Sequence, residues 1–198
     1  MRTIGITGGV GAGKSELLAY IEKNYNSRIL LADTVGHRVK EPGQPCYEKL
    51  VALLGKEILF PDGQIDRKAM AERIFADPEL LEQVNGMIHP AVETYILEQI
   101  HLEQVRGTLD FFFIEAALLI ECGYEDKVDE LWYIYADREV RARRLKAARG
   151  YSNEKIQEIM DSQLSEEEFR RHCQVVIDNS GSLQDAYRQI DEILKGNV

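Results

Sequence analysis

Five short apolar runs recur along the chain, each with the length and composition of a buried strand. They span Thr3–Thr7, Arg28–Ala32, Asp110–Ile114, Leu131–Tyr135 and Gln174–Ile177. Segments with apolar residues at helical spacing separate them. Strands that alternate with helices predict an α/β fold built on a five-stranded parallel sheet with right-handed crossovers. In such sheets, ligands bind at the carboxyl ends of the strands.

The longest interval between two of these runs, residues 36–103, contains no strand-like segment. Turn-forming dipeptides interrupt its helical patterns at Pro42-Gly43, Asp62-Gly63, Asp77-Pro78 and His89-Pro90. We therefore predict that residues 36–103 form a mostly helical subdomain that projects beside the ligand site. No repeat or linker divides the rest of the sequence, so residues 1–198 are expected to form one domain with this insertion.

Length and composition agree with one globular domain. The chain has 198 residues, of which 44% are hydrophobic and 29% charged, enough to bury a sizeable core. It has no run of 18 apolar residues, and Met1-Arg2 leads directly into a strand. We therefore expect no membrane span, no signal peptide and a cytoplasmic location. Cys46, Cys122 and Cys173 show neither CxxC nor zinc-site spacing, which indicates reduced thiols.

The formal net charge of −10 argues against a broad surface for nucleic acid or membrane. Binding a polyanion requires many exposed Lys and Arg side chains, and here acids outnumber bases. A small anionic ligand is compatible with this charge if positive groups are concentrated locally. They are concentrated around Lys14 and in residues 138–149, which are therefore the two candidate anion sites.

The first of these sites has the pattern of a phosphate-binding loop. Gly8, Gly13, Lys14 and Ser15 match G-x-x-x-x-G-K-[ST] between a strand and a helix. The alternative is a glycine-rich turn that caps the helix and binds nothing, but such a turn has no need of Lys and Ser at the helix start. Glycines let consecutive backbone N–H groups face phosphate oxygens, and the helix N-terminus that follows favours an anion. Lys14 is expected on the β- and γ-phosphates of a triphosphate, with the Ser15 hydroxyl as a Mg²⁺ ligand. The other predicted nucleotide contacts along the loop are Gly9, Val10, Gly11, Ala12, Gly13 and Glu16.

Two acids follow predicted strands and are candidates for chemistry. An Asp after a strand is often the N-cap of the next helix, and Asp33 has that position. In a protein with a phosphate-binding loop, however, a kinase needs a carboxylate to take the proton of the attacking hydroxyl, which favours Asp33 as this base. Glu115 directly follows the third run, where it would hold Mg²⁺ through water or orient the acceptor, although an acid after an apolar strand is by itself a weak signal.

Three further segments have a functional and a structural interpretation. Arg67, in the expected first turn of a helix, either pairs with a substrate phosphate or is a solvated cation. His89 before Pro90 is either a helix-end residue or a substrate contact. Residues 138–149 carry five arginines and one lysine, usually the mark of a solvated helix face. We favour a lid here, because guanidinium groups stabilise the charge that develops in phosphoryl transfer.

A polar turn at Asn179 would lie next to the loop, where an adenine ring could bind.

Taken together, these residues resemble the dephospho-CoA kinase family, which completes coenzyme A biosynthesis. The likeness spans nearly the whole chain, and the order of its scattered matches is more specific than the phosphate-binding loop alone. The matches are Ile4–Ser15, Ala32-Asp33, His37, Pro42-Gly43, Tyr47, Gly63, Asp66-Arg67, Phe75, His89-Pro90, Leu118-Leu119, Glu121, Gln163 and Ile177–Asn179.

The resemblance implies a three-layer P-loop kinase fold with a helical CoA-binding insertion and a lid at about residues 138–165. It implies transfer of the γ-phosphate of ATP to the ribose 3′-hydroxyl of dephospho-CoA, giving CoA and ADP. Asp33 would be the base, Lys14, Arg141 and Arg144 would contact the phosphates, and Mg²⁺ would bind Ser15. The implied acceptor contacts are Asp33, Arg67, His89, Leu118, Leu119 and Glu121, with Asn179 on the nucleotide. We expect a monomer or weak homo-oligomer that acts on this small molecule and not on nucleic acid.

Several positions depart from the family pattern. Leu31, Glu16, Ala117 and Ala148 stand where Asp, Thr, Pro and Arg are usual, and Arg141 stands at a Gln position. On a continuous helix, Arg149 would point about 100° away from the arginine expected at position 148. Either the helix is irregular there or another arginine substitutes. The departures leave two alternatives open: an idle nucleotide- or CoA-binding regulator, or a P-loop kinase of another nucleotide or nucleoside.

Overall fold

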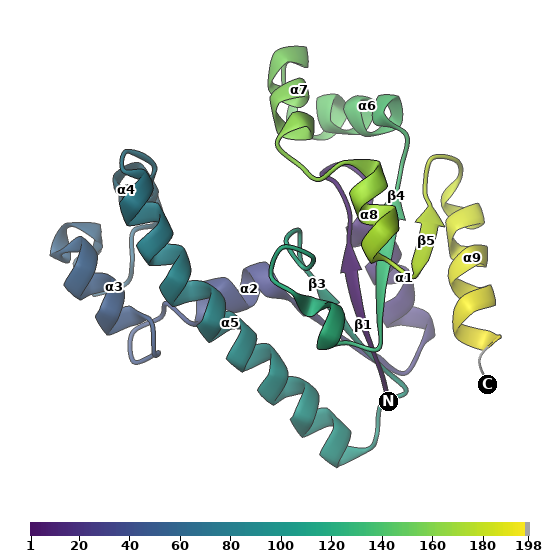
Figure 1. The fold of residues 1–198 in the computed structure, drawn as a ribbon, viewed down its shortest axis with the longest axis horizontal. Helices are drawn as coiled ribbons and strands as arrows, with labels where there is room; N and C mark the ends of the chain where they lie inside the picture. The colour runs from purple at the N-terminus through teal and green to yellow at the C-terminus, as the bar shows by residue number, and fades with distance from the viewer. Residues whose placement is uncertain (197–198) are drawn as a thin grey trace. The chain divides into compact units, whose positions relative to one another are not determined.

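The strands form where the apolar runs predict them, in a computed structural model that describes residues 1–196 (Figure 1). Their bounds are β1 Arg2–Thr7, β2 Ser27–Leu31, β3 Phe111–Glu115, β4 Glu130–Tyr135 and β5 Val175–Asp178. They make one five-stranded sheet in the order β2-β3-β1-β4-β5. β1 pairs in parallel with both β3 and β4, and β4 pairs in parallel with β5. The α/β fold with a five-stranded parallel sheet is confirmed.

Helices fill the intervals between the strands, and polar residues set several of their starts. The helices are α1 Lys14–Asn24, α2 Ala32–Arg38, α3 Tyr47–Leu54, α4 Arg67–Phe75, α5 Pro78–Arg106, α6 Arg138–Arg149, α7 Asn153–Asp161, α8 Glu166–His172 and α9 Leu183–Lys195. The side chains of Asp66, Ser152, Ser165 and Ser182 accept hydrogen bonds from backbone N–H groups in the first turns of α4, α7, α8 and α9. These caps satisfy amides that a helix start leaves unpaired.

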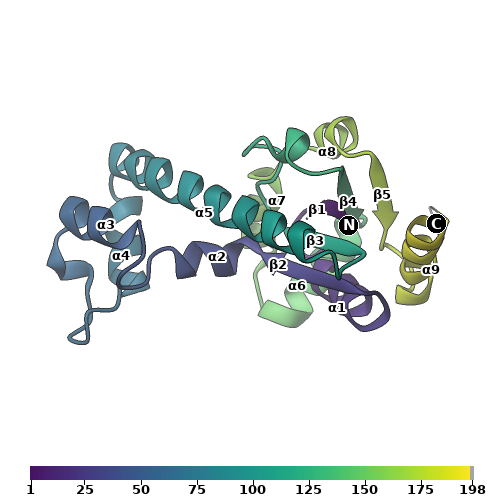
Figure 2. The same cartoon turned by 90° about the horizontal axis from the view of Figure 1, so that it is seen from below.

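The chain divides into two compact units, of which the first joins Met1–Ile29 to the segment that starts at Arg106. On one face of its sheet, α1 and α9 bury Leu17, Ile21 and Ile190 against strand residues that include Ile4 and Trp132. On the other face, the Phe169 ring of α8 stacks on Tyr133 of β4 with ring centroids 4.5 Å apart. Figures 1 and 2 show α8 on the side of the strands opposite α1. Alternate side chains of β4 thus pack against helices on opposite faces of the sheet, so the unit has three layers: helix, sheet and helix.

The second unit, Leu30–Val105, contains α2 to α5, with α3 and α4 gathered around the N-terminal half of α5 (Figure 2). Its buried apolar residues are Val35, Val39, Leu50, Leu54, Ile58, Met70, Ile74, Val84, Ile96 and Ile100. Within residues 36–103, extended pairing is confined to one isolated bridge, Leu59 with Ile65. The helical character predicted for residues 36–103 is confirmed, whereas their role as an acceptor-binding subdomain stays a prediction.

One helix boundary predicted from the sequence is wrong. α5 continues through Pro90, so His89 lies inside a helix and does not end one. Proline costs a helix interior roughly 3 kcal/mol because it lacks an N–H and crowds the preceding turn. Val84, Ile96 and Ile100 are buried on both sides of Pro90, and their packing outweighs this local preference.

Two global expectations concern thiols and membranes. Cys46, Cys122 and Cys173 are free thiols, as their spacing predicted. None of the helices within residues 1–196 is both long and apolar enough to cross a lipid bilayer.

Candidate active site

The loop between β1 and α1 has the backbone that a phosphate-binding loop requires. Gly8, Gly11 and Gly13 have φ values of 144°, 84° and 89°, a range that side chains disfavour. Gly13 is the N-cap of α1, and Lys14 is the first residue of that helix. The loop therefore ends at a helix N-terminus, where backbone amides and the helix dipole favour an anion.

Lys14 is held inside this loop by oxygen atoms on two sides. Its Nζ donates a hydrogen bond to the Gly8 carbonyl at 2.7 Å and lies 3.6 Å from Oε1 of Glu115, at the end of β3. The side chains of Lys14 and Glu115 are only 14% and 18% exposed. A full positive charge thus sits at the carboxyl end of the central strand, next to a carboxylate from the neighbouring strand.

The residues suggested for a metal ion offer oxygen ligands of the right kind. Ser15 is the second residue of α1 and exposed, and Glu115 ends β3 as the sequence predicted. A hydroxyl and a carboxylate suit Mg²⁺, which usually binds one or two such groups together with substrate phosphates and water. Within residues 1–196, no cluster of three or more His, Cys, Asp or Glu side chains is arranged to hold a metal.

Asn179 and Arg144 support the other side of the loop. Asn179 follows β5, is fully buried, and donates from Nδ2 to the Ala12 carbonyl at 2.7 Å. Arg144 of α6 donates from Nη1 to the Gly11 and Ala12 carbonyls at 3.5 and 3.2 Å, and from Nη2 to the Asn179 carbonyl at 2.9 Å. The polar turn predicted beside the loop is confirmed, and its amide side chain lies beneath the loop backbone.

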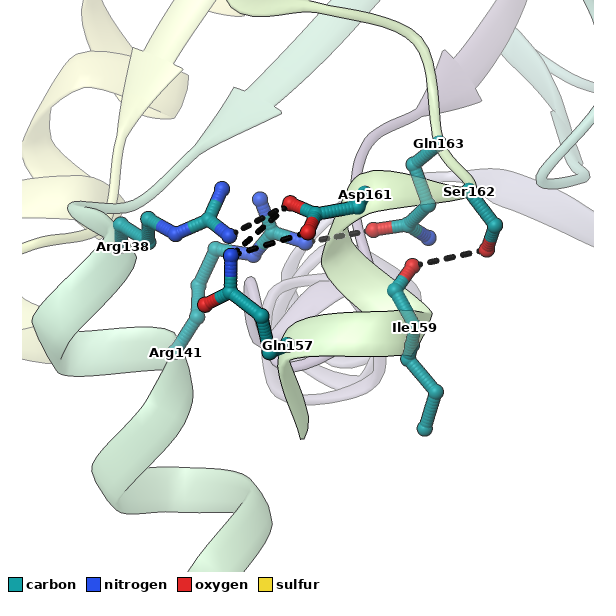
Figure 3. Close-up of polar contacts among 7 residues, drawn as sticks. All are labelled: Arg138, Arg141, Gln157, Ile159, Asp161, Ser162 and Gln163. Carbon is teal, nitrogen blue, oxygen red and sulfur yellow. Dashed lines mark hydrogen bonds and ion pairs between the residues drawn. The ribbon is translucent and has the colours of Figure 1, made fainter. Parts of the chain in front are cut away.

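Arg141, one turn earlier on α6, joins the loop to the segment after α7. Its Nε donates to the Val10 carbonyl at 3.0 Å, and its Nη2 donates to Oε1 of Gln163. The same Gln163 oxygen accepts from the Val10 backbone N–H at 3.2 Å. Figure 3 shows Gln163 facing Arg141, while Arg138 and Gln157 converge on Asp161. Burial lowers the pKa of Arg141.

A small apolar cluster fixes α6 and α7 against each other and against the loop. Leu145, Ile156 and Met160 are buried in it, with Val10 of the loop packed against them. Arg141 and Arg144 are partly buried and bonded to the loop, so the interpretation of residues 138–149 as a wholly solvated face is wrong. A lid function for the segment stays a prediction.

The end of α6 excludes one of the two explanations for why an arginine stands at position 149 and not at position 148. The helix is continuous to Arg149, and Gly150 ends it with a φ of 63°, so a local irregularity at position 148 is not the explanation. The Arg149 guanidinium lies 5.8 Å from the ring centroid of Tyr151, on the exposed side of this segment. Arg141 and Arg144 are instead the arginines of α6 that reach the loop.

The segment after β3, expected to line an acceptor pocket, presents its side chains unequally. Leu119 is 1% exposed and fills space beside Gly5 of β1, whereas Leu118 is 49% exposed. Glu121 is exposed in the turn that follows. The Leu119 side chain therefore anchors the turn, and Leu118 and Glu121 are the two members of the trio available to a ligand.

Asp33 belongs to the helical unit, in the first turn of α2, and is exposed. The N-cap of α2 is Leu31, and the start of this helix has no side-chain capping hydrogen bond. The interpretation of Asp33 as an N-cap is therefore wrong, because the helix begins one residue before it. Its role as the base stays a prediction.

Arg67 begins α4, as predicted, and is not an isolated surface cation. Its Nη1 lies 3.3 Å from Nε2 of His37, and both residues border a cavity of about 450 Å³ together with Lys40. His89 is exposed on α5. Sequence reasoning missed Lys40 as a member of this group, although its spacing of three residues from His37 resembles one helical turn. It also left Gln163 without a role, since nothing in its local sequence indicates a contact with Val10.

Comparisons with known proteins cover almost the whole chain. A model of the dephospho-CoA kinase family matches residues 2–185. The dephospho-CoA kinases of Geobacter sulfurreducens and Aquifex aeolicus are each 37% identical over 194 residues, covering 98% of this chain and 97% and 96% of theirs. The solved structure of a dephospho-CoA kinase from Campylobacter jejuni has a TM-score of 0.74 at 27% identity, covering 99% of this chain and 98% of that one. The Thermus thermophilus protein TT1252 has a TM-score of 0.81 at 31% identity, covering 100% and 98%.

Proposed function

The chain belongs to the dephospho-CoA kinase family, and on this premise we propose how its residues move the γ-phosphate of ATP to the ribose 3′-hydroxyl of dephospho-CoA. The products are CoA and ADP, and the reaction is the last step of coenzyme A synthesis. The observation that carries this proposal is the loop at residues 8–15, with Lys14 seated inside it, in a chain that matches the family over nearly its full length.

In the proposed reaction, Asp33 takes the proton of the 3′-hydroxyl as the ribose oxygen attacks the γ-phosphorus of ATP. The bond between that phosphorus and the bridging oxygen to the β-phosphate breaks, and ADP leaves. Lys14 neutralises charge on the β- and γ-phosphates. Ser15 and Glu115 are the residues that would hold Mg²⁺, which supplies further charge neutralisation on the phosphates when bound.

Arg141 and Arg144 donate further hydrogen bonds to the phosphates in this proposal. A guanidinium carries five N–H donors, and the carbonyls of the loop and of Asn179 together with Gln163 engage only some of them. The rest are available for phosphate oxygens when residues 138–165 close as a lid over the nucleotide. Such closure would exclude water and limit wasteful hydrolysis of ATP.

The helical segment 36–103 holds the acceptor in this proposal, through Arg67 and His89, while Leu118 and Glu121 contribute from the turn after β3. We also propose that the enzyme is cytoplasmic and a monomer or weak homo-oligomer, which size-exclusion chromatography with light scattering tests. Its free thiols are compatible with a reducing compartment.

Replacing Asp33 with Asn tests the base, because the amide keeps the size of the side chain and removes its basicity. We expect kcat with dephospho-CoA to fall by about 10²–10⁴-fold, with the Kd for ATP from calorimetry within about twofold of wild type. Glu48→Gln, an exposed charge removal in the first turn of α3, is the matched control and should leave kcat unchanged. Undiminished turnover by Asp33→Asn would rule out the role.

The acceptor itself is tested by comparing substrates in an assay of ADP formation. Dephospho-CoA should give the highest kcat/KM, and product identity should be checked by mass spectrometry of the CoA formed. Faster phosphorylation of a nucleoside monophosphate would contradict the proposed acceptor.

A further inference from the structure

Three basic side chains border a cavity of about 450 Å³ within the helical unit. His37 and Lys40 come from α2 and the residues just after it, and Arg67 from the start of α4. The guanidinium of Arg67 can only donate, so Nε2 of His37, at 3.3 Å, accepts the hydrogen bond. His37 therefore orients Arg67, and its Nδ1 carries the ring proton and remains a donor.

Lys40 and Arg67, the two cationic side chains of this cavity, have no acidic partner among the described residues. Among residues 1–196, no carboxylate oxygen lies within 4 Å of the side-chain nitrogens of Lys40 or Arg67. Two acids also border the cavity: Asp62, whose Oδ1 accepts from the backbone of Gln64 at 3.0 Å, and Glu41, which is exposed. Burial lowers the pKa of Lys40, and Arg67 lowers it further, so the positive charges repel each other across the cavity. Burial and the same Arg67 also lower the pKa of His37.

Like charges held together without a counter-ion are unfavourable, and a bound anion would remove that cost. An anion with two charged groups fits two cations better than a single phosphate does. Arg67 offers a planar fork for one phosphate group, and Lys40 offers a mobile point charge for a second. The acceptor of the proposed reaction contains such an anion, because a pyrophosphate joins its adenosine to its pantetheine arm.

We propose that this cavity binds the pyrophosphate of dephospho-CoA, with Lys40 and Arg67 as its two cationic ligands and His37 as the residue that orients Arg67. The proposal rests on the proposed function and extends it to a substrate group and to Lys40. It also places Arg67 on the pyrophosphate of the acceptor and not on the phosphoryl group that is transferred.

The test uses Lys40→Met, which keeps the aliphatic stem and removes the charge. The Kd for dephospho-CoA, measured by calorimetry without ATP, should rise by about tenfold or more, the loss expected for one charge-assisted hydrogen bond. KM for dephospho-CoA should rise in parallel, while the Kd for ATP stays within twofold. Lys40→Arg keeps the charge and should restore most of the binding. Lys68→Met is the matched control, because Lys68 is 85% exposed on α4, beside Arg67, and does not border the cavity.

Three outcomes overturn the proposal: a Kd for dephospho-CoA that changes less than twofold in Lys40→Met, an equal change in Lys68→Met, or a change in the Kd for ATP instead. Thermal unfolding of each variant checks that the fold is intact, and Lys40→Gln provides a second neutral variant. A wild-type chain that binds dephospho-CoA but does not phosphorylate it contradicts the proposed function alone, because the binding measurements still report on Lys40.

Discussion

Asn179 is a single side chain on which the backbone of the phosphate-binding loop depends. It is fully buried, its Nδ2 satisfies the Ala12 carbonyl, and its Oδ1 has no partner among the described residues. Replacing it with Ala removes one of the two donors of that carbonyl, to which Arg144 still donates, and also removes the unpaired oxygen. We therefore expect a loss of about 1 kcal/mol in the free energy of unfolding, at the low end for a buried hydrogen bond, and a raised KM for ATP.

Asn24→Ala is the control for this experiment. Asn24 makes the same kind of bond, from Nδ2 to the Tyr20 carbonyl at 2.7 Å, but on an exposed helix end. Urea denaturation should show a change below about 0.5 kcal/mol for this variant. If both substitutions lower the free energy of unfolding by the same amount, burial does not determine how much the Asn179 hydrogen bond stabilises the protein.

Cys173 gives a pH dependence that can be isolated. Burial, and to a lesser extent Glu125, raises the pKa of its thiol from 9.0 to about 12. The folded state disfavours the thiolate, so this thiol contributes stability that is fully present below pH 9 and is lost as the pH rises toward 12. The free energy of unfolding should therefore fall more steeply between pH 8.5 and 10.5 in wild type than in Cys173→Ala. Parallel slopes in the two proteins would contradict this assignment.

At the scale of elements, α6 determines how the loop is held. Arg144→Ala removes the donor for the Gly11, Ala12 and Asn179 carbonyls at once. We expect kcat/KM for ATP to fall by about 10²-fold or more, as for other lost electrostatic donors. Arg143→Ala, an exposed neighbour on the same helix, should change it less than twofold. Equal losses would mean that the total charge of α6 matters and not the contacts of Arg144.

The elements were predictable from sequence because their patterns are local. Five strands, the helix that starts at Lys14 and the one that starts at Arg67 follow from apolar spacing and glycine positions within a few residues. The continuation of α5 through Pro90 was not predictable, because buried residues on both sides of it decide the matter. The burial of Leu119 is likewise set by Gly5, more than a hundred residues away in the chain.

The candidate site divides in the same way. A motif fixes Lys14 and Ser15 by sequence alone, and Glu115 follows from the end of a strand. The hydrogen bonds from the Val10 N–H to Gln163 and from Arg144 to the loop carbonyls join segments more than a hundred residues apart, so no local pattern encodes them. The place of Lys40 in the cavity could not be predicted, because it depends on the proximity of Lys40 to Arg67 in the fold and not on any sequence motif.

At the scale of the whole molecule, the two units have separate ligands in the proposed reaction, and hydrogen exchange can examine each one separately. Near-saturating ATP at about 100 times its Kd should stabilise the protein by about 2.7 kcal/mol. ATP alone should protect amides of residues 8–15 and of α6. Dephospho-CoA alone should protect amides of α2 and α4. Protection of α2 and α4 by ATP alone would contradict this division of ligands.

A final consequence concerns Gly9, whose backbone is touched by an arginine that lies 132 positions further along the chain. A Cβ at Gly9 would lie 2.3 Å from Nη2 of Arg141, and the flexible guanidinium would be displaced before the loop itself. The two positions are therefore epistatic: once alanine stands at position 9, the identity of residue 141 loses most of its effect. A transplant of residues 8–15 into another scaffold would, for the same reason, carry over the motif without the contact that Gly9 permits.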